Sequence, residues 1–140
     1  MKIEGRVKGT EKAVAQISKI SSNVTDEMRL VVKEGMLLIH GTARKSIQEH
    51  QSRGNKYGEH YASRPGNPPN TDTGRLVGSI EFDYDQDTNS AQVGTNLDYG
   101  AWLEFGTSTI AARPWLKPAF DKHKKEILNS FKAALRKGTK

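Results

Sequence analysis

The feature that most constrains the fold is a six-residue alternation of apolar and acidic side chains. Ile80, Phe82 and Tyr84 alternate with three acidic residues, turn-forming residues follow over 87–90, and a second short run spans 91–95. A period of two places alternate side chains on opposite faces of a strand, and Asp, Asn and Ser favour turns. The sequence therefore predicts a β-hairpin with an acidic outer face and an apolar face that must pack on other elements.

Helical patterns precede the hairpin. A short helix is predicted over 10–20 and is broken by Ser21-Ser22-Asn23, and a longer helix begins at Thr25. Gly35 and Gly41 lie inside the longer helix, where each glycine costs about 1 kcal/mol, which indicates close packing at both positions. The apolar stripe of this helix is Met28, Val31, Val32, Leu38, Ile39, Ala43 and Ile47.

A last helix is predicted from Pro114, because proline suits the first turn of a helix. Its stripe is Leu116, Phe120, His123, Ile127, Phe131 and Leu135, and we expect His123 to be a hydrogen-bonded core histidine. The patterns together predict an α+β fold in one domain over 1–140. In this fold a small antiparallel β-sheet from 2–8, 79–85 and 90–96 packs against the long N-terminal helix and the C-terminal helix.

Two segments are predicted to lie outside this framework. Residues 48–72 are dominated by Gln, His, Ser, Arg, Gly, Asn and Pro. Uninterrupted loops longer than roughly 12–15 residues are uncommon in compact domains and are often functional or disordered. We therefore expect a long mobile loop over 48–72, and a disordered tail over 137–140.

The charges are segregated along the chain. The 140 residues carry 22 basic and 16 acidic side chains, a net charge of +6 with a pI near 9.6, which by itself suggests a nucleic-acid partner. Residues 113–140, however, hold nine bases and two acids, and the remainder of the chain nets −1. The 37 residues of 76–112 contain no Lys or Arg. This pattern indicates two opposed charged surfaces.

The residue types that catalysis and metal binding need are missing or badly spaced. The absence of cysteine excludes disulfides, thiolate zinc sites and cysteine nucleophiles. The four histidines lack metal-ligand spacing, and the run from Asp83 fails as a calcium loop because Thr88 and Gly94 replace the required glycine and glutamate. No nucleophile elbow, phosphate-binding glycine loop or HExxH motif is present. We expect no enzyme activity, metal or cofactor.

The hydropathy pattern gives no indication of a membrane protein. Mean hydropathy is −0.72, and no apolar run approaches the roughly 20 residues of a membrane span. Residues 1–5 have no apolar stretch of signal-peptide type. We expect a soluble intracellular protein.

Two motif blocks carry a resemblance to a known family. The first is Pro65-Gly-Asn-Pro-Pro69 followed by Asp72-Thr-Gly-Arg-Leu-Val-Gly-Ser-Ile80. The second is Asp98-Tyr-Gly-Ala-Trp-Leu-Glu-Phe-Gly-Thr-Ser108 followed by Ala112-Arg-Pro-Trp-Leu-Lys-Pro-Ala-Phe120. In this order they resemble the signature of the tail-completion or head–tail joining proteins found in the neck of long-tailed phages and prophages. The resemblance covers residues 65–127.

We interpret the signature as a fold-defining corner between the hairpin and the last helix. Tyr99, Trp102, Leu103 and Phe105 are expected to supply apolar area at this corner, and its glycines permit the turns. Arg113 is expected to reach Glu104. The predicted signature and interface residues are Asp72, Thr73, Gly74, Leu76, Ser79, Tyr99, Gly100, Trp102, Glu104, Phe105, Gly106, Thr107, Arg113, Pro114, Trp115, Leu116, Pro118 and Phe120.

The resemblance implies a structural virion protein without enzyme activity or cofactor. Its expected place is the neck of the virion, and the host cytoplasm during assembly. The expected partners are further copies of itself in a ring, with a hexamer implied by the family, together with connector or head-completion proteins and tail-terminator or tail-tube proteins. The 48–72 loop is expected to become ordered against a neighbouring subunit.

Charge complementarity is the expected basis of ring formation, with the base-free region of one subunit facing the basic helix of the next. The residues expected to take part are Lys117, Lys122, Lys124, Lys125, Asp83, Asp85 and Asp87. The alternative is a DNA-binding module in which the same helix makes sequence-independent phosphate contacts, either alone or lining a channel that DNA crosses. A prophage-borne toxin or regulator is a third possibility that no specific feature supports.

Overall fold

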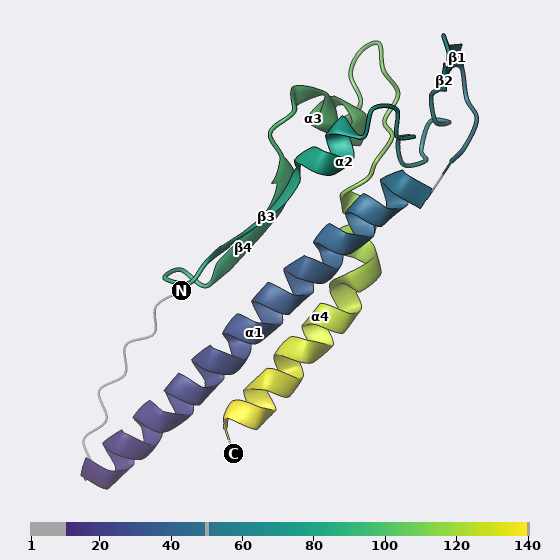
Figure 1. Ribbon diagram of the computed structural model, residues 1–140. Coiled ribbons are helices and arrows are strands. Elements are labelled where there is room, and N and C mark those ends of the chain that lie inside the picture. The colour runs from purple at the N-terminus through teal and green to yellow at the C-terminus, as the bar shows by residue number, and fades with distance from the viewer. Residues whose placement is uncertain (1–10, 50, 140) are drawn as a thin grey trace.

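A computed structural model describes residues 11–49 and 51–139. These residues form two long helices, two small hairpins and two short helices, in the order shown in Figure 1. The α+β class is therefore confirmed. The predicted edge strand over 2–8 lies outside the described residues.

The first helix, α1, is continuous from Glu11 to Glu49. The predicted break at Ser21-Ser22-Asn23 is wrong, because these exposed polar side chains cost little there. The Thr25 hydroxyl also donates to the Ser21 carbonyl oxygen, at 2.9 Å, one helical turn back.

The last helix, α4, runs from Lys117 to Gly138 and lies beside α1 (Figure 1). It begins three residues after Pro114, which was its predicted start, and Pro118 lies in its first turn. It also extends two residues into the predicted 137–140 tail.

Glycines set the approach of α1 and α4. A Cβ on Gly35 would lie 3.0 Å from the Ile127 side chain, which confirms the close packing predicted there. A Cβ on Gly138 would crowd the Val24 backbone at the other end of the pair. The same prediction is wrong for Gly41, which faces open space.

The predicted hairpin is confirmed as β3 (Ile80–Asp85) and β4 (Ser90–Thr95), paired antiparallel from Ile80 opposite Thr95 to Asp85 opposite Ser90. Ile80, Phe82 and Tyr84 turn inward, whereas the acidic residues between them are exposed. This inner face packs on α1, where the His40 ring nitrogen Nε2 lies 3.1 Å from the Ile80 carbonyl oxygen.

The segment expected to be a mobile loop carries its own small structure in the described residues. A second hairpin pairs β1 (Lys56–Tyr57) with β2 (His60–Tyr61). The Asn70 side-chain amide donates to the carbonyl oxygens of Ser52 and Tyr61, at 2.6 and 2.8 Å. These bonds tie the two ends of the segment together, and its predicted mobility remains a prediction.

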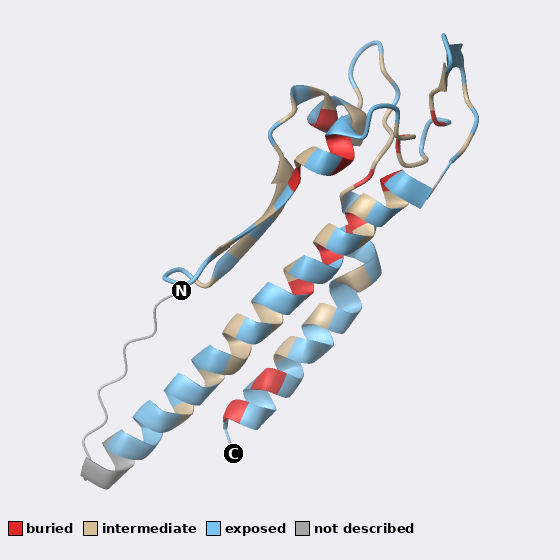
Figure 2. Ribbon diagram, in the orientation of Figure 1, coloured by how far each residue is buried: buried red, intermediate tan, exposed pale blue. Residues whose placement is uncertain are grey.

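The core is concentrated at one end of the molecule, where the last third of α1 meets α2 (Arg75–Ser79), α3 (Asp98–Phe105) and the start of α4 (Figure 2). Its buried members are Ile39, Ala43, Ile47, Leu76, Val77, Ile80, Trp115 and Ala119. Three residues of the predicted stripes, Leu38, Phe120 and Leu135, are exposed instead. Ala119 and Ala134 take the buried positions on α4, because small residues allow α1 to approach closely.

Candidate assembly surface

The corner between α3 and α4 is built on the carboxylate of Glu104. Its two oxygens accept hydrogen bonds from the backbone N–H groups of Trp115, Leu116 and Lys117, at 2.7, 2.8 and 2.8 Å. The first N–H groups of a helix have no hydrogen-bond partner within the helix, and a negative charge beside them interacts favourably with the positive end of the helix dipole. A side chain of α3 thus caps α4 and fixes the angle between them.

Arg113 does not pair with Glu104, so that prediction is wrong. Because the backbone at the start of α4 occupies the carboxylate, the guanidinium turns the other way. Its Nε donates to the Ser63 carbonyl oxygen at 2.9 Å, and the Arg113 backbone N–H donates to Leu103 at 2.6 Å. Arg113 therefore joins the corner to the segment that precedes α2. Pro114 is half-buried beside it.

Trp115 anchors the corner in the core. Its side chain is 2% exposed, and the indole Nε1–H donates to the Gly100 carbonyl oxygen at 2.9 Å. Gly100 must remain small, because an added Cβ would collide with the Thr95 side chain. Gly106 has a positive φ of 75°, which glycine adopts without strain, and the Thr107 N–H after it donates to Ile110.

The earlier motif block forms the turn before the hairpin. Gly74 has φ 76° at the start of α2, and the Thr73 hydroxyl oxygen lies 3.4 Å from the Arg75 N–H nitrogen. Leu76 enters the core, and the Ser79 and Thr95 hydroxyl oxygens lie 2.6 Å apart. Residues of the first motif block thus contact one another at the start of α2 and at the start of the hairpin.

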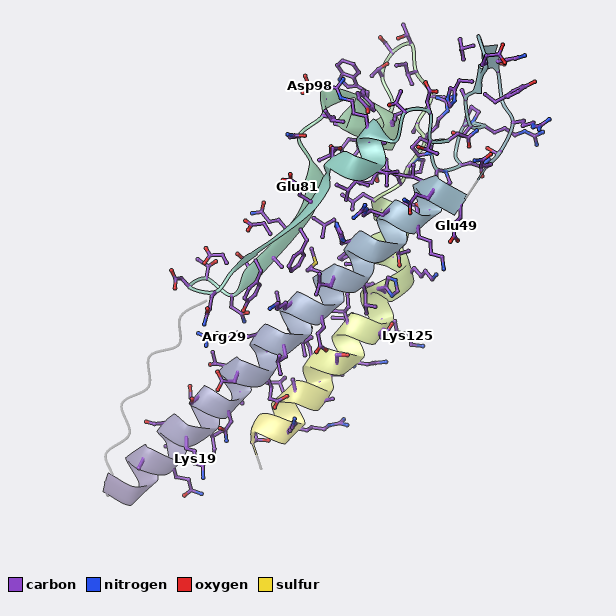
Figure 3. The ribbon with its side chains drawn as sticks, viewed as in Figure 1. Lys19, Arg29, Glu49, Glu81, Asp98 and Lys125 are labelled. Carbon is purple, nitrogen blue, oxygen red and sulfur yellow. The ribbon has the colours of Figure 1, made fainter. Side chains whose placement is uncertain are left out.

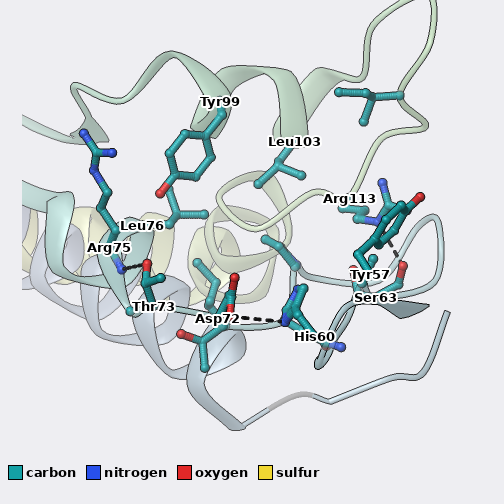
Figure 4. A pocket seen from close by; sticks show the side chains of 17 residues that line it. Tyr57, His60, Ser63, Asp72, Thr73, Arg75, Leu76, Tyr99, Leu103 and Arg113 are labelled. Atoms are coloured by element: carbon teal, nitrogen blue, oxygen red, sulfur yellow. Dashed lines mark hydrogen bonds and ion pairs between the residues drawn. The ribbon is translucent and has the colours of Figure 1, made fainter. Parts of the chain in front are cut away.

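Signature residues from both blocks line a cavity of about 520 Å³ (Figure 4). Asp72 lies beside His60 on one wall, with 3.8 Å between carboxylate and imidazole, and Tyr99 and Leu103 form another wall. Ser63 is fully buried, and its hydroxyl has no hydrogen-bond partner among the described residues. Both polar and apolar side chains line the cavity. The sequence did not predict this cavity, because its walls come from segments as far apart in the chain as Ile47 and Arg113.

The two faces of α3 differ in a way that the sequence analysis missed. Tyr99 and Leu103 pack on the core, as predicted, but Trp102 and Phe105 are 50% and 82% exposed. The predicted contribution of these two aromatic side chains to the interior of the corner is therefore wrong. The spacing gave a signal for Phe105 alone: Leu103 is four residues after Tyr99 and shares its face, whereas Phe105 is two residues after Leu103 and does not. Trp102, three residues after Tyr99, gave no such signal.

The charged residues predicted to assemble are exposed on two separate elements. The acids of β3 and its turn lie on the hairpin and the bases lie on α4; in the view of Figure 3, Glu81 and Lys125 lie on either side of α1. Asp121 lies 2.6 Å from Lys117, and this hydrogen bond raises the pKa of the Lys117 ammonium group.

No cluster of three or more His, Asp or Glu residues suited to a metal ion occurs in the part of the chain that the structure describes. His123 is half-buried, and its Nε2 lies 2.6 Å from the Thr42 hydroxyl oxygen, as expected of a hydrogen-bonded histidine within a packed interface. Within the described ranges, no helix has the length and apolar character that crossing a membrane requires.

Comparison with known proteins decides the family. A family model described as "Bacteriophage HK97-gp10, putative tail-component" matches residues 11–106. The chain belongs to this HK97-gp10-like family of phage tail components. The match includes α1, the first motif block and α3, whereas the Ala112–Phe120 part of the second block lies beyond it. No curated protein and no solved structure matches the chain significantly.

Proposed function

We propose that this protein is the tail-completion subunit of a long-tailed phage or prophage, which assembles into a ring in the neck and joins the tail to the head. Membership of the phage tail-component family carries the proposal. The two separated charged surfaces support it, because a subunit whose complementary patches lie on different sides associates head to tail. Such association closes into a ring when the rotation between neighbours allows it.

In this ring the acidic outer face of β3 meets the basic face of α4 on the next subunit. Opposite charges on apposed surfaces fix register and increase the rate of encounter. A hexamer, as the resemblance to neck proteins implies, matches the symmetry of the tail. The part of the 48–72 segment that follows α1, with its exposed Tyr57, becomes further ordered against a neighbour.

The ring contacts a connector or head-completion protein on one side and a tail-terminator or tail-tube protein on the other. Its place is the virion neck, and its subunits are in the host cytoplasm before assembly. Particles made without the protein test this role by electron microscopy. We expect filled heads and finished tails that remain separate, and normal joined virions would contradict the proposal.

Ring formation tests the charge mechanism separately. Light scattering on purified protein at two salt concentrations should show larger assemblies at low salt, because salt screens exposed charges. Lys124→Glu with Lys125→Glu should weaken assembly, whereas the matched pair Lys19→Glu with Lys33→Glu, two exposed lysines of α1, should not. Assembly insensitive to salt and to the α4 pair would contradict the charge mechanism.

A second function is favoured by the same basic helix. Exposed lysines on α4 could contact phosphates of DNA, either in solution or where DNA crosses the ring. Titration of random-sequence duplex at two salt concentrations measures this. Steeply salt-dependent binding at physiological ionic strength would favour the DNA-binding function, and no binding at low salt would exclude it.

A further inference from the structure

An apolar groove lies between the hairpin and α4. It measures about 260 Å³, its floor is Val32 and Met36 of α1, and Ala91 of β4 forms one wall. The other wall is α4, which contributes Phe120, Leu128 and Phe131. Ligand pockets of small molecules usually measure roughly 300–1,000 Å³ and enclose their ligand. This shallower, smaller groove suits a few protein side chains.

The α4 wall presents an ordered stripe of side chains. Lys124, Leu128 and Phe131 are spaced by four and three residues, so they lie on one face of the helix, and Leu135 continues it. Leu128 is 51% exposed and Lys124 is the charged residue in the groove lining. Exposed apolar stripes that continue over several turns mark interaction sites.

The outer face of α3 presents a stripe with the same spacing. Asp98, Trp102 and Phe105 are also four and three residues apart, and all three are exposed. Two aromatic side chains can each bury roughly 150–250 Å² in a contact. An acid followed by two aromatics on α3 therefore matches a base followed by two apolar residues on α4. Within one molecule α3 lies at the far end of the hairpin from the tip that Ala91 adjoins (Figure 1).

We propose that the α3 stripe of one copy docks into the apolar groove of the next, with Trp102 and Phe105 packed on Leu128 and Phe131, and with Asp98 beside Lys124. The occupant is a second copy of this chain, because the complementary charge and the large exposed aromatic side chains are both on α3. Docking and receiving surfaces are different patches, so the contact is head to tail and each copy can make it twice. The proposal rests on the proposed ring and locates its central contact.

Cross-linking tests this contact directly, because the native chain contains no cysteine. Purified Phe105→Cys protein is mixed with Leu128→Cys protein under mild oxidation, and covalent dimers are measured by gel and mass spectrometry. We expect dimers joining position 105 to position 128. The matched controls pair Leu128→Cys with Tyr57→Cys or with Ile17→Cys, two other exposed apolar positions. Equal cross-linking in a control, or none for the 105–128 pair at high protein concentration, would overturn the proposal.

Exchanging the charges of Asp98 and Lys124 provides a second test of the contact. Asp98→Lys and Lys124→Asp should each raise the concentration needed for assembly by roughly tenfold, as removing a central interface residue does, and combining both changes should restore it. Trp102→Ala with Phe105→Ala should weaken assembly at least as much, while unfolding temperature is unchanged because these side chains are exposed. Rings that form normally with these variants would overturn this inference and leave the proposed neck function intact. Virions that join normally without the protein would instead defeat the proposed function.

Discussion

The two ends of the molecule are held together in different ways. At the end that contains α2 and α3, Trp115 is buried and polar backbone groups have specific side-chain partners. At the other end, α1 extends beyond α4, and Ile17 is 49% exposed. The close approach of Gly138 to Val24 and an ion pair of 2.9 Å between Lys137 and Glu27 are the ties there. Stability therefore concentrates at the end that contains α2 and α3.

The largest expected effect comes from removing the anchor of the stable end. Trp115→Ala should lower the free energy of unfolding by about 3–5 kcal/mol, because it leaves a cavity and an unpaired Gly100 carbonyl. Ile17→Ala at the opposite end should change it by less than about 0.5 kcal/mol. Urea unfolding of both variants measures the contrast, and equal effects would show that the ends do not differ.

Removal of the Glu104 cap should have the next largest effect. Glu104→Ala deprives three N–H groups of their acceptor and should cost roughly 1–3 kcal/mol. Glu104→Gln should cost less, because its amide oxygen still accepts while the charge is lost. Glu81→Ala, an exposed acid on β3, is the control. If Glu104→Ala and Glu81→Ala lowered the unfolding temperature by the same amount, the capping role would be contradicted.

The two α1 glycines should respond in opposite directions. Gly41→Ala faces open space and should stabilise the protein by about 0.5–1 kcal/mol through helix propensity. Gly35→Ala gains the same propensity but pushes on Ile127, so we expect a net loss of up to about 2 kcal/mol. The midpoints of urea unfolding of the two variants, each relative to the unchanged protein, measure this difference. A stabilising Gly35→Ala would mean that the α1–α4 contact is loose.

The smallest expected effect lies in the hairpin turn. Hydrogen bonds from the Thr88 side chain and from the backbone of Asp87 and Thr88 hold the pKa of Asp85 below the ordinary value of an aspartate. A lowered pKa in the folded state contributes stability above the unfolded pKa, and this is lost as pH falls through the folded value. Thr88→Val should raise the pKa of Asp85, measured by NMR titration. An unchanged value would contradict this cause.

Local patterns predicted the elements whose side chains repeat regularly. The hairpin was predicted over 79–85 and 90–96 and is observed within one residue at each end, because alternation both forms strands and sets their register. His123 was predicted as a hydrogen-bonded residue of the α4 stripe, and its Nε2 lies 2.6 Å from the Thr42 hydroxyl oxygen. On α4 the small residues Ala119 and Ala134 are buried while Phe120 and Leu135 are exposed, because periodicity predicts a stripe but not which side of it the partner helix covers.

The sequence alone determined the hairpin, the helical segments, the charge segregation and the resemblance to phage neck proteins, since these depend on residues close together in the chain. Only the tertiary structure decided that Glu104 caps α4, that Arg113 turns to Ser63, and that the outer face of α3 stays exposed. A carboxylate has several possible partners within reach in the sequence, and the geometry of the folded chain selects the backbone N–H groups at the start of α4.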